Sequence, residues 1–409
     1  MCMFVTSRAR MSEIGCAEMN SSGQNWILGF ERPDGKVGIR NHVAVIPTVV
    51  CATVVARRIA MSLRGASYVD NQFGCSQLEP DLEVTFRTLA GVGRNPNVAS
   101  VLLVSLGCEE LPVEKLADTI ASSGKSVEVV VIQECGGTTS TVDKGVAVLK
   151  RLVEEASRLR PRRFDVSSLV IGVKCGGSDA TSGIAANPVV GYVSDKVVDL
   201  GGTIVMSETP EMIGAEHVLI KRIAEPATRD KLLAAIKRWL KIAEERGVDI
   251  VGAQPTRGNI AGGITTIEEK SLGAIIKGGS RPIRGILEYA EEIKGRGLYI
   301  MDTPGNDAMS LAGMVAGGAQ MILFTTGRGT PLGNPVAPVI KITGNPHTYA
   351  RMRENMDFDA SPVLLGQKTV SEVGEQLFEL VLEVARGKLT RAEVLGHNEF
   401  VINKILPSL

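Results

Sequence analysis

Short runs of aliphatic and β-branched residues alternate with stretches of helical periodicity through most of this 409-residue chain. In the first part, the runs typical of buried parallel strands are HVAVIPTV from His42, VASVLLVSLG from Val98 and VEVVVIQE from Val127. Between them, ATVVARRIAMSLRG and DLEVTFRTLAGVG carry apolar residues at helical spacing. Strands that alternate with helices form βαβ units, so the pattern predicts a mainly parallel sheet.

A second series of apolar runs follows the polar, proline-marked stretch RLRPRRFDV. Its members are SLVIGVKC, GTIVMSE, GLYIMDT, MILFTTG and PVIKIT, again with helical stretches between them. We therefore predict an α/β protein of two lobes, each built on a mainly parallel sheet with βαβ units. An N-terminal lobe is expected at 26–160 and a C-terminal catalytic lobe at 161–409. Residues 1–25 are expected to be a disordered lead, or to precede a true start at Met11 or Met19.

Three features punctuate the second lobe. Residues 225–247 carry the apolar stripe of a surface helix, and SEVGEQLFELVLEVARGK predicts another helix that ends at Gly387. The glycine-rich stretch 252–263 predicts a long loop, and long loops inside compact domains are usually functional.

Charge and composition narrow the functional class. Lys plus Arg equals Asp plus Glu at 45 each, so no imbalance favours nucleic acid or an anionic membrane as a partner. No apolar run is long enough to cross a bilayer, and the first 25 residues lack the apolar core of a signal peptide. The 7 cysteines, an odd number spread thinly, predict reduced thiols in a cytoplasm.

Small and charged residues follow seven of the predicted strands. In a parallel sheet, ligands bind outside the carboxyl ends of the strands, so these stretches are the candidates for an active-site cleft. They are 71–77, 107–110, 133–140, 174–187, 207–211, 302–307 and 325–329.

The stretch KCGGSDATSG, which begins at Lys174, is the strongest of these candidates. Its glycines allow main-chain N–H groups to approach a ligand, and the start of a helix favours anions. For Ser178 and Asp179 alone, an ordinary helix N-cap is the favoured explanation. Arg328, in TTGRG, is placed to clamp a carboxylate, or else to form a salt bridge. We assign substrate binding to Gly176, Gly177, Ser178, Ser182, Asn187 and Arg328.

The thiols leave two explanations open. Cys75, Cys108 and Cys175 each lie beside glycine at a predicted strand end, where metal or iron–sulfur ligation and a small buried side chain are about equally supported. Cys51 and Cys135 are expected to be buried apolar residues. No CxxC pair is present. The predicted metal ligands are Cys75, Cys108, Glu109 and Cys175.

Acid–base chemistry falls to lysine and carboxylate side chains because the 4 histidines are not in metal-binding spacing and poorly support a hydrolytic triad. The predicted catalytic residues are Lys174, Glu134 and Asp179, with Glu109 and Glu208 as further candidates. Neither GxxxxGK[ST] nor a GxGxxG that opens a helix is present, so nucleotide binding lacks its usual support.

Eight ordered motifs resemble the altronate/galactarate dehydratase family from about Phe30 to the carboxyl end. They are GFERPDGKVGIRNHVAVIPTVVCA, FGCSQLEPDLEVTFRTLAGVGRNPNV, SLGCEE, IQECGGT, KCGGSDATSGIAANP, GNIAGGITTIEEKSLG, MDTPGND and FTTGRG. The resemblance covers the large catalytic part, without the small β-rich N-terminal domain of many members, and it implies that a separate small subunit supplies that domain. One departure is Asn71, where the family motif usually has histidine. His42 often corresponds to tyrosine in relatives and is given no catalytic role.

The resemblance implies a cytoplasmic lyase that removes water from an aldonate or aldarate such as altronate, with Fe²⁺ or Mn²⁺, and yields a 2-keto-3-deoxy acid. A related branch eliminates sulfite from sulfolactate, so a sulfo-lyase is an alternative. An iron–sulfur dehydratase and a non-catalytic sugar-acid-binding protein are further alternatives. The expected partners are a small sugar acid, the small subunit and further copies of the chain.

Overall fold

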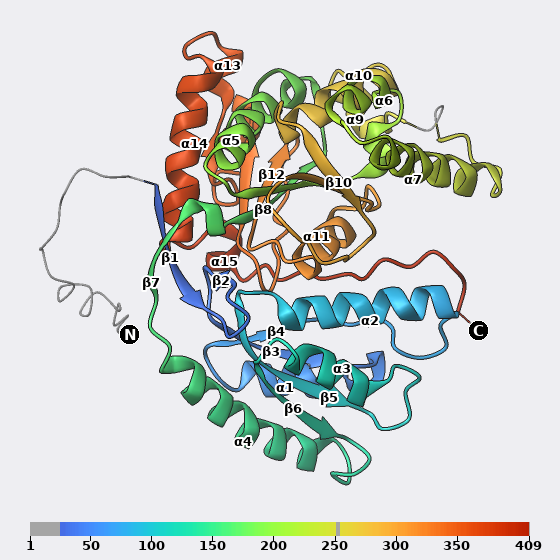
Figure 1. The fold of residues 1–409 in the computed structure, drawn as a ribbon, viewed down its shortest axis with the longest axis vertical. Helices are drawn as coiled ribbons and strands as arrows, with labels where there is room; N and C mark the ends of the chain where they lie inside the picture. The colour runs from blue at the N-terminus through green and yellow to red at the C-terminus, as the bar shows by residue number, and fades with distance from the viewer. Residues whose placement is uncertain (1–24, 251–253, 409) are drawn as a thin grey trace, which may run out of the picture.

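The smaller of two parallel sheets forms the N-terminal part of the protein in the computed structural model, which describes residues 25–250 and 254–408 (Figure 1). Its strand order is β4-β3-β5-β6. The strands are β3 (His42–Pro47), β4 (Ala66–Tyr68), β5 (Val98–Ser105) and β6 (Ser126–Val131). Each is parallel to its neighbour, as expected for apolar runs joined by helices.

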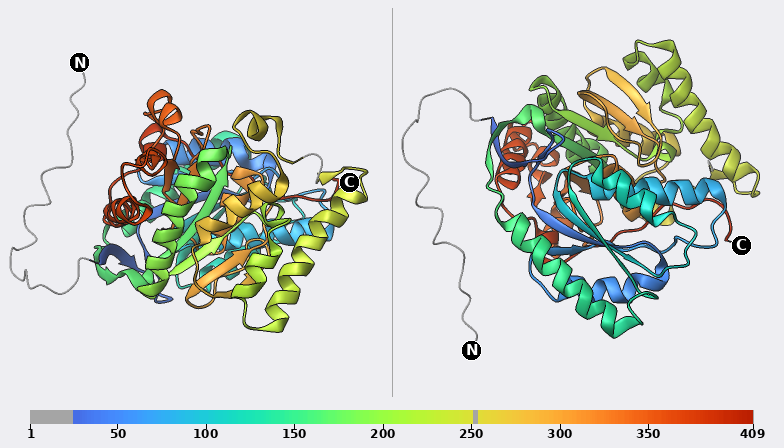
Figure 2. Two further views of the ribbon diagram at one scale, coloured as in Figure 1. Left: turned by 90° about the horizontal axis from the view of Figure 1, so that it is seen from above. Right: turned by 60° about the horizontal axis from the view of Figure 1, so that its bottom comes forward.

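Helices cover both faces of this sheet (Figure 2). On one face lie α1 (Thr53–Met61) and α4 (Thr138–Ser157), whose Ile59 and Leu149 pack on Val45 in one core. On the other face lie α2 (Glu79–Arg94) and α3 (Val113–Ala121), which pack against each other. The β-branched runs are therefore buried on both sides, which explains why they show no alternation of polar residues.

The larger sheet has seven parallel strands in the order β10-β11-β9-β8-β12-β13-β14. The strands are β8 (Val170–Gly176), β9 (Thr203–Met206), β10 (Ile283–Leu287), β11 (Gly297–Met301), β12 (Met321–Thr326), β13 (Val339–Thr343) and β14 (Phe358–Asp359). One face packs on α5 (Asn187–Asp199), α7 (Pro226–Glu244) and α14 (Val370–Ala385). The other face packs on α11 (Asp307–Ala316).

The two sheets share one hydrophobic core through α2 and α11. Leu89 of α2, Leu311 of α11 and residues of both sheets belong to the same cluster. The last residues of the chain run between these two helices (Figure 1), where Phe400 and Ile402 are buried. The Asp81 carboxylate accepts hydrogen bonds from the N–H groups of Ile405 (3.1 Å) and Leu406 (2.7 Å). The C-terminal segment thus ties one lobe to the other.

A small antiparallel sheet joins the start of the described chain to the connection between the lobes. It consists of β1 (Trp26–Glu31), β2 (Val37–Gly38) and β7 (Arg162–Asp165), in the order β2-β1-β7. The connection between α4 and β8 therefore runs as a paired strand.

The predicted fold class, an α/β protein with parallel sheets and βαβ units, is confirmed. Residues 252 and 253 of the predicted glycine-rich loop lie outside the described residues, and for 254–263 the prediction is only partly correct because this stretch contains helix α9 (Arg257–Ala261). Thr256 and Asn259 form a capping box at its start, which offsets the cost of the glycines. The predicted lead at 1–25 lies outside the described residues except for Asn25. No helix in the described ranges is long and apolar enough to span a membrane.

Candidate active site

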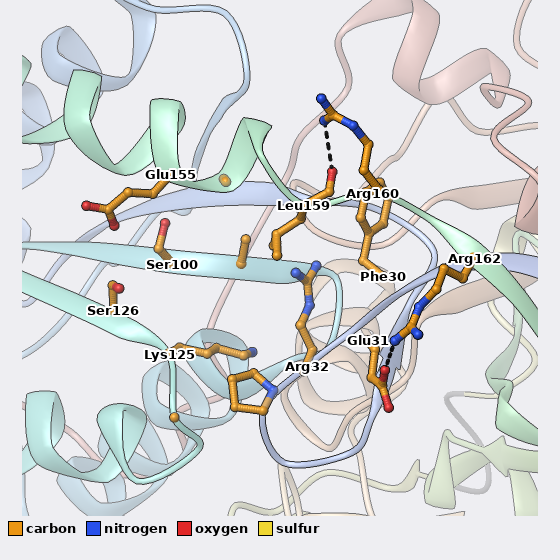
Figure 3. A pocket seen from close by; sticks show the side chains of 14 residues that line it. Phe30, Glu31, Arg32, Ser100, Lys125, Ser126, Glu155, Leu159, Arg160 and Arg162 are labelled. Atoms are coloured by element: carbon orange, nitrogen blue, oxygen red, sulfur yellow. Dashed lines mark hydrogen bonds and ion pairs between the residues drawn. The ribbon is translucent and has the colours of Figure 1, made fainter. Parts of the chain in front are cut away.

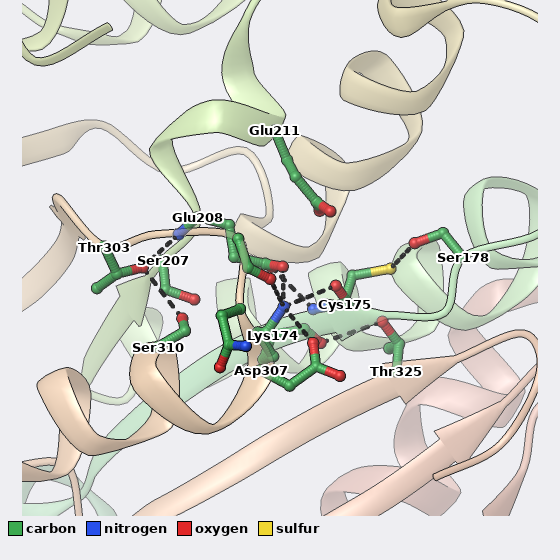
Figure 4. A network of polar contacts seen from close by, with 12 residues as sticks. Lys174, Cys175, Ser178, Ser207, Glu208, Glu211, Thr303, Asp307, Ser310 and Thr325 are labelled. Atoms are coloured by element: carbon green, nitrogen blue, oxygen red, sulfur yellow. Dashed lines mark hydrogen bonds and ion pairs between the residues drawn. The ribbon is translucent and has the colours of Figure 1, made fainter. Parts of the chain in front are cut away.

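The carboxyl end of β8 places a lysine and a cysteine at the centre of a polar cluster (Figure 4). Lys174 is completely buried, and its ammonium lies over the ring of Phe324, 5.8 Å from the ring centroid. Neighbouring strands β9 and β11 end at the same edge, so the segments that follow them, at Glu208 and Asp307, reach the same ammonium.

Two buried lysines share one buried glutamate. The Lys174 ammonium forms ion pairs with the Glu208 carboxylate and, at 2.9 Å, with Oδ1 of Asp307. Lys277 Nζ lies 3.0 Å from Glu208 Oε2, which also accepts the N–H of Cys175 at 2.9 Å. Such a network is weak evidence for stability, because desolvation of the charges opposes their attraction. Buried and strongly interacting charges of this kind are typical of functional sites.

The charges in this cluster set each other's protonation. Burial alone lowers the pKa of Lys174, but Glu208, followed by Asp307 and Glu211, raises it well above its usual value. Burial raises the pKa of Glu208, but Lys174 and Lys277 outweigh that effect and lower it. At neutral pH the structure therefore holds an ammonium and a carboxylate here, and Lys174 is not a free amine.

An unusual backbone conformation directs Glu208 toward the lysines. Its φ of 73° lies in the left-handed region, which costs a residue with a Cβ roughly 1 kcal/mol. The N–H of Glu208 donates to Thr303 Oγ1 at 2.8 Å, and that oxygen lies 3.0 Å from Ser310 Oγ. Strain of this kind persists where the surroundings hold it, and it is common at functional sites.

A cavity of about 250 Å³ adjoins the cluster. The strand-end loops and α10 (Ile267–Ile275) supply most of its polar lining, which includes Gly176, Gly177, Ser178, Glu211, Asn259, Lys270, Ser271, Gly305 and Asp307. Two buried lining atoms, Glu211 Oε2 and Ser271 Oγ, have no hydrogen-bond partner among the described residues. Buried polar atoms without a partner are rare, so this cavity is suited to a polar ligand.

Glu211 is the carboxyl group best placed for proton transfer. Its Oε1 pairs with Lys270 Nζ at 3.1 Å, while its other oxygen lacks a described partner. Burial raises the pKa of Glu211, and the negative charge of Glu208 raises it further. A carboxyl group with a raised pKa can give and take a proton nearer to neutral pH.

Gly176 is required for the approach of Asp307. A Cβ at this position would lie 2.6 Å from Asp307 Oδ1, which itself contacts Lys174. Gly177, with a φ of 57°, adopts a backbone conformation that residues with a Cβ rarely adopt. Glycine is therefore needed at each of these two positions for a different structural reason: space for Asp307 at Gly176 and backbone conformation at Gly177.

The remaining residues of the predicted substrate loop divide between lining and support. Ser178 Oγ lies 2.9 Å from Cys175 Sγ, and Asn187 donates to the same sulfur at 3.6 Å. Thr325 donates to Asn187 Oδ1 at 2.6 Å. Ser182 and Asn187 line a second cavity, of about 210 Å³, together with Ser178. Burial raises the pKa of the Cys175 thiol.

Asp179 is engaged by its own loop. Its Oδ1 accepts from Thr181 Oγ1 at 2.7 Å and from the N–H of Ser182 at 3.1 Å, and its Oδ2 accepts from Asn345 Nδ2 at 2.9 Å. This is the capping arrangement that the sequence favoured for Asp179. Arg328 is exposed, and its guanidinium donates to the Gly258 carbonyl at 3.1 Å rather than to a carboxylate.

The other predicted residues lie at the carboxyl edge of the smaller sheet. Cys75 and Cys108 are exposed, and Gln133 donates to the Cys108 sulfur at 3.4 Å. Glu109 accepts the N–H of Gly107 at 2.7 Å and the hydroxyl of Thr48, so it fixes its own loop. Its burial raises its pKa, but these hydrogen bonds, the Thr48 one first, lower it overall. Glu134 is exposed on the next loop.

The predicted metal ligands are therefore divided. Cys75, Cys108 and Glu109 follow strands of the smaller sheet, whereas Cys175 is buried at the end of β8 in the larger one. Among the residues that the structure describes, no group of three or more His, Cys, Asp or Glu side chains is arranged to hold a metal ion. The four residues do not fit a single metal or iron–sulfur site in this structure.

Two further expectations concern the thiols Cys51 and Cys135 and the departure from the family motif expected at Asn71. Cys51 is exposed and Cys135 only half-buried, so the expectation that both are buried is wrong, because both lie in turns beyond strand ends. Asn71 is buried and shapes a turn: it donates to the Pro47 carbonyl at 3.1 Å and accepts the N–H of Phe73 at 3.0 Å.

Comparison with known proteins places the chain in a family. The sequence model described as D-galactarate/altronate dehydratase, C-terminal, matches residues 166–408. A second, described as D-galactarate dehydratase/altronate hydrolase, second domain, matches residues 29–157. The chain belongs to the D-galactarate/altronate dehydratase family. The predicted family and the predicted enzyme class, a lyase, are confirmed.

Three relatives in this dehydratase family show how far the likeness extends. The beta subunit of (2R)-sulfolactate sulfo-lyase from Chromohalobacter salexigens is 40% identical over 383 residues, which cover 93% of this chain and 98% of the relative. Altronate dehydratase from Bacillus subtilis is 36% identical over 388 residues, 92% of this chain and 77% of the relative. Galactarate dehydratase (L-threo-forming) from Escherichia coli is 32% identical over 396 residues, which cover 91% of this chain and 76% of the relative.

Sequence reasoning missed two lysines of the site. Lys270 lies on α10 and Lys277 in the 3₁₀ turn that follows it, so neither belongs to a strand end. A signal was present for Lys277, because IIKGGS repeats the pattern of VKCGGS, with a lysine after an apolar run and before two glycines. Lys277 is 1% exposed, a burial that a charged residue tolerates only with a partner.

Proposed function

We propose that this chain catalyses β-elimination from a small 2-hydroxy acid in the cavity beside Lys174. The substrate is a sugar acid such as altronate, and the product is a 2-keto-3-deoxy acid. The observation that supports this most directly is the buried Lys174–Glu208–Lys277 network next to a polar cavity with an unpartnered Glu211 oxygen. Membership of the dehydratase family supports the same reaction class.

Elimination requires a proton to leave C2 and a hydroxyl to leave C3. The proton on carbon next to a carboxylate is barely acidic, so the negative charge that develops on the carboxylate must be stabilised. Lys174 and Lys270 supply fixed positive charge at the cavity. We assign Lys174 to this electrostatic role because its carboxylate neighbours keep it protonated.

Two carboxyl groups on the cavity wall supply the proton transfers. Asp307, the first residue of α11 after β11, accepts the C2 proton, and Glu211, with its raised pKa, donates a proton to the departing hydroxyl. The C2–H and C3–O bonds break, a C2=C3 double bond forms, and water leaves. The resulting enol takes a proton at C3 and loses its hydroxyl proton to give the keto acid. Ser178, Ser271 and the Gly176–Gly177 turn bind the substrate's carboxylate and hydroxyls.

Metal dependence on Fe²⁺ or Mn²⁺ stays a prediction. The residues present do not fit one metal site, so no step above depends on an ion. Dialysis against a chelator, followed by addition of either ion, measures the dependence directly. We expect activity to fall on dialysis and to return with one of the two ions; unchanged turnover in metal-free buffer would contradict it.

A sulfo-lyase is the second candidate, and one observation favours it. The sulfolactate sulfo-lyase subunit is matched over 98% of its length, whereas the altronate dehydratase from Bacillus subtilis is matched over 77%. The same site then breaks a C3–S bond in place of C3–O and releases sulfite. Because that relative is named as a beta subunit, this candidate also supports a separate small subunit as partner.

The experiment is a panel of acids with the intact chain, with and without Fe²⁺ or Mn²⁺. Altronate, galactarate and sulfolactate are supplied, and 2-keto-3-deoxy acid, pyruvate and sulfite are measured. We expect one substrate class to be consumed, and we expect calorimetry to show that the same acid binds. If none of the acids binds the chain and none is converted, the proposal is wrong.

A further inference from the structure

A cavity of about 620 Å³ opens at the amino-terminal edge of the smaller sheet (Figure 3). Its walls are the starts of β5 and β6, the end of α4 and the segment after β1, represented by Ser100, Lys125, Leu159 and Arg32. The loops with Cys75 and Cys108 follow the opposite ends of the strands, and the Lys174 cluster belongs to the other sheet. This cavity is therefore separate from the candidate active site.

Two cations are buried in the wall of this cavity without a carboxylate partner. Arg32 is 3% exposed and Lys125 is 5% exposed, and neither forms an ion pair with any described carboxylate. Main-chain carbonyls hold them instead: Arg32 Nε donates to Pro96 at 2.6 Å, and Lys125 Nζ donates to Asn95 at 2.6 Å. Buried charges are normally paired, so these two leave positive charge in the cavity wall that Asp34, which is not in ion-pair contact with either, offsets only in part.

Burial is the main cause of a lowered pKa at both groups. Burial lowers the pKa of Arg32 to about 10, although the charge of Asp34 opposes this effect. Burial, followed by the nearby Arg32 charge, lowers the pKa of Lys125 well below its usual value, and Asp34 again opposes the shift only in part. A bound anion would relieve both effects, because an opposite charge favours the charged form of each group.

Several hydrogen-bond donors of these groups remain unused. A guanidinium has five N–H donors, of which Arg32 uses three on described acceptors, and an ammonium has three, of which Lys125 uses two. Ser100 is 4% exposed, and its buried hydroxyl has no hydrogen-bond partner among the described residues. Figure 3 shows Ser100, Arg32 and Lys125 around the same space. An oxyanion supplies the several acceptors that these donors lack.

The rim adds charge and the wall adds apolar surface. Arg160 is exposed, donates to the Ser157 carbonyl at 2.7 Å, and forms no ion pair within the described chain. The other charged residues at the rim are neutralised, because Arg162 pairs with Glu31, and an oxygen of Glu155 lies 3.3 Å from Nη1 of Arg151. Phe30, Ala99 and Leu159 line the cavity as well, which suits a ligand with an organic body.

We propose that this cavity binds the phosphate or carboxylate group of a small organic anion, at a site distinct from the candidate active site. The cations of Arg32, Lys125 and Arg160 and the hydroxyl of Ser100 hold the oxyanion, and the apolar wall contacts the rest of the molecule. Because Lys125 also binds the carbonyls at the end of α2, the ligand stabilises the N-terminal lobe when it binds.

Calorimetric titration tests the site with three probes at constant ionic strength: inorganic phosphate, a hexose 6-phosphate and citrate. We expect saturable binding of at least one probe, with a rise in melting temperature. Tighter binding of the hexose phosphate than of inorganic phosphate identifies a phosphorylated metabolite as the ligand, and tighter binding of citrate identifies a carboxylate. No saturable binding of any probe would overturn the proposal.

Variants at the rim separate this site from general charge effects. Arg160→Gln is expected to weaken binding about tenfold, the worth of one charge-assisted hydrogen bond. Ser100→Ala is expected to weaken it several-fold. Arg158→Gln removes the same charge two residues away, outside the cavity, and Arg328→Gln removes one near the candidate active site; neither should change the affinity. Equal weakening by Arg158→Gln and Arg160→Gln, or no effect of Arg160→Gln and Ser100→Ala, would refute the site.

Discussion

At the scale of single residues, the site depends on charges that are buried together. Glu208 holds two lysines that are each almost inaccessible to solvent, and it does so from a left-handed backbone conformation. Removing one member of such a group leaves a buried charge without compensation, which costs far more than the loss of an exposed pair. The residues to which we assign the chemistry are therefore also the ones most sensitive to substitution.

Glu208→Gln is expected to lower the free energy of unfolding by about 3 kcal/mol, because two buried ammonium groups lose their shared carboxylate. Urea denaturation measures the change. Glu383→Gln is the matched control: its pair with Lys388 is exposed, 53% on both side chains, and we expect little loss of stability there. Equal stability of the two variants would contradict the account of the buried network.

The pH dependence of stability follows from the lowered pKa of Glu208. A carboxylate whose folded pKa is below its unfolded value contributes stability that is present above the unfolded pKa, about 4.3 for Glu, and is lost as pH falls through the folded value. The wild-type protein should therefore lose stability more steeply than Glu208→Gln below about pH 4. Denaturation at a series of acidic pH values checks this, and parallel curves for the two proteins would speak against it.

Glu211→Gln is expected to lower kcat at least about 100-fold, the usual contribution of a general acid or base. Its raised pKa also predicts that wild-type turnover falls as pH rises and Glu211 loses its proton. Steady-state kinetics across pH measures both effects. Glu268→Gln, an exposed carboxylate at the start of the nearby helix α10, serves as the control and should keep full activity. Normal turnover in Glu211→Gln would remove Glu211 from the mechanism.

At the scale of elements, the ends of β8, β9 and β11 determine which side chains come together in the candidate site. Parallel pairing brings their carboxyl ends to one edge, and Gly176 lets the loop after β11 come close enough for Asp307 to reach Lys174. Helix α9 contacts the loop that follows β8, since the side-chain amide of Asn259 donates to the Ser178 carbonyl at 2.8 Å. The cavity is thus a product of how four segments end or begin.

Gly176→Ala is expected to reduce activity strongly and to destabilise the protein by about 1–3 kcal/mol, the usual cost of overpacking. The added methyl would meet Asp307 Oδ1 and push it from Lys174. In an Asp307→Ala background, part of that stability cost should disappear, which a double-mutant cycle of unfolding free energies detects. Fully additive effects would show that the contact does not act as described.

At the scale of the whole molecule, two parallel sheets share one core, and the C-terminal segment lies between them. The loops of the smaller sheet carry exposed thiols, whereas the larger sheet carries the buried charges. A segment that packs against both lobes couples their stability, because loosening it exposes apolar surface on each.

Ile402→Ala is expected to cost about 2–5 kcal/mol of stability, since the side chain is fully buried in the shared core. Probes in both lobes should show the loss in the same denaturation transition. Ile405→Ala, three residues on and 40% exposed, is the control and should cost much less. A loss confined to one lobe would mean that the segment does not couple them.

The sequence by itself determined the fold class and part of the site. Apolar runs joined by helical stretches are typical of parallel sheets, so the pattern predicted the fold class. The rule that ligands bind at strand ends selected Lys174, Gly176, Gly177 and Ser178 as candidate site residues. It could not find Lys270, because a helix brings this residue to the cavity from a separate part of the chain.

Only the tertiary structure decided which strand ends share a cavity. The strand-end rule places a residue at the edge of its own sheet, but the partition of the strands into two sheets depends on packing between distant segments. That partition separated Cys75, Cys108 and Glu109 from Cys175, and it brought Glu208 and Asp307 to Lys174. The local pattern of apolar and polar residues indicates where a strand ends. Burial of apolar surface between distant segments determines which residues lie beside that end.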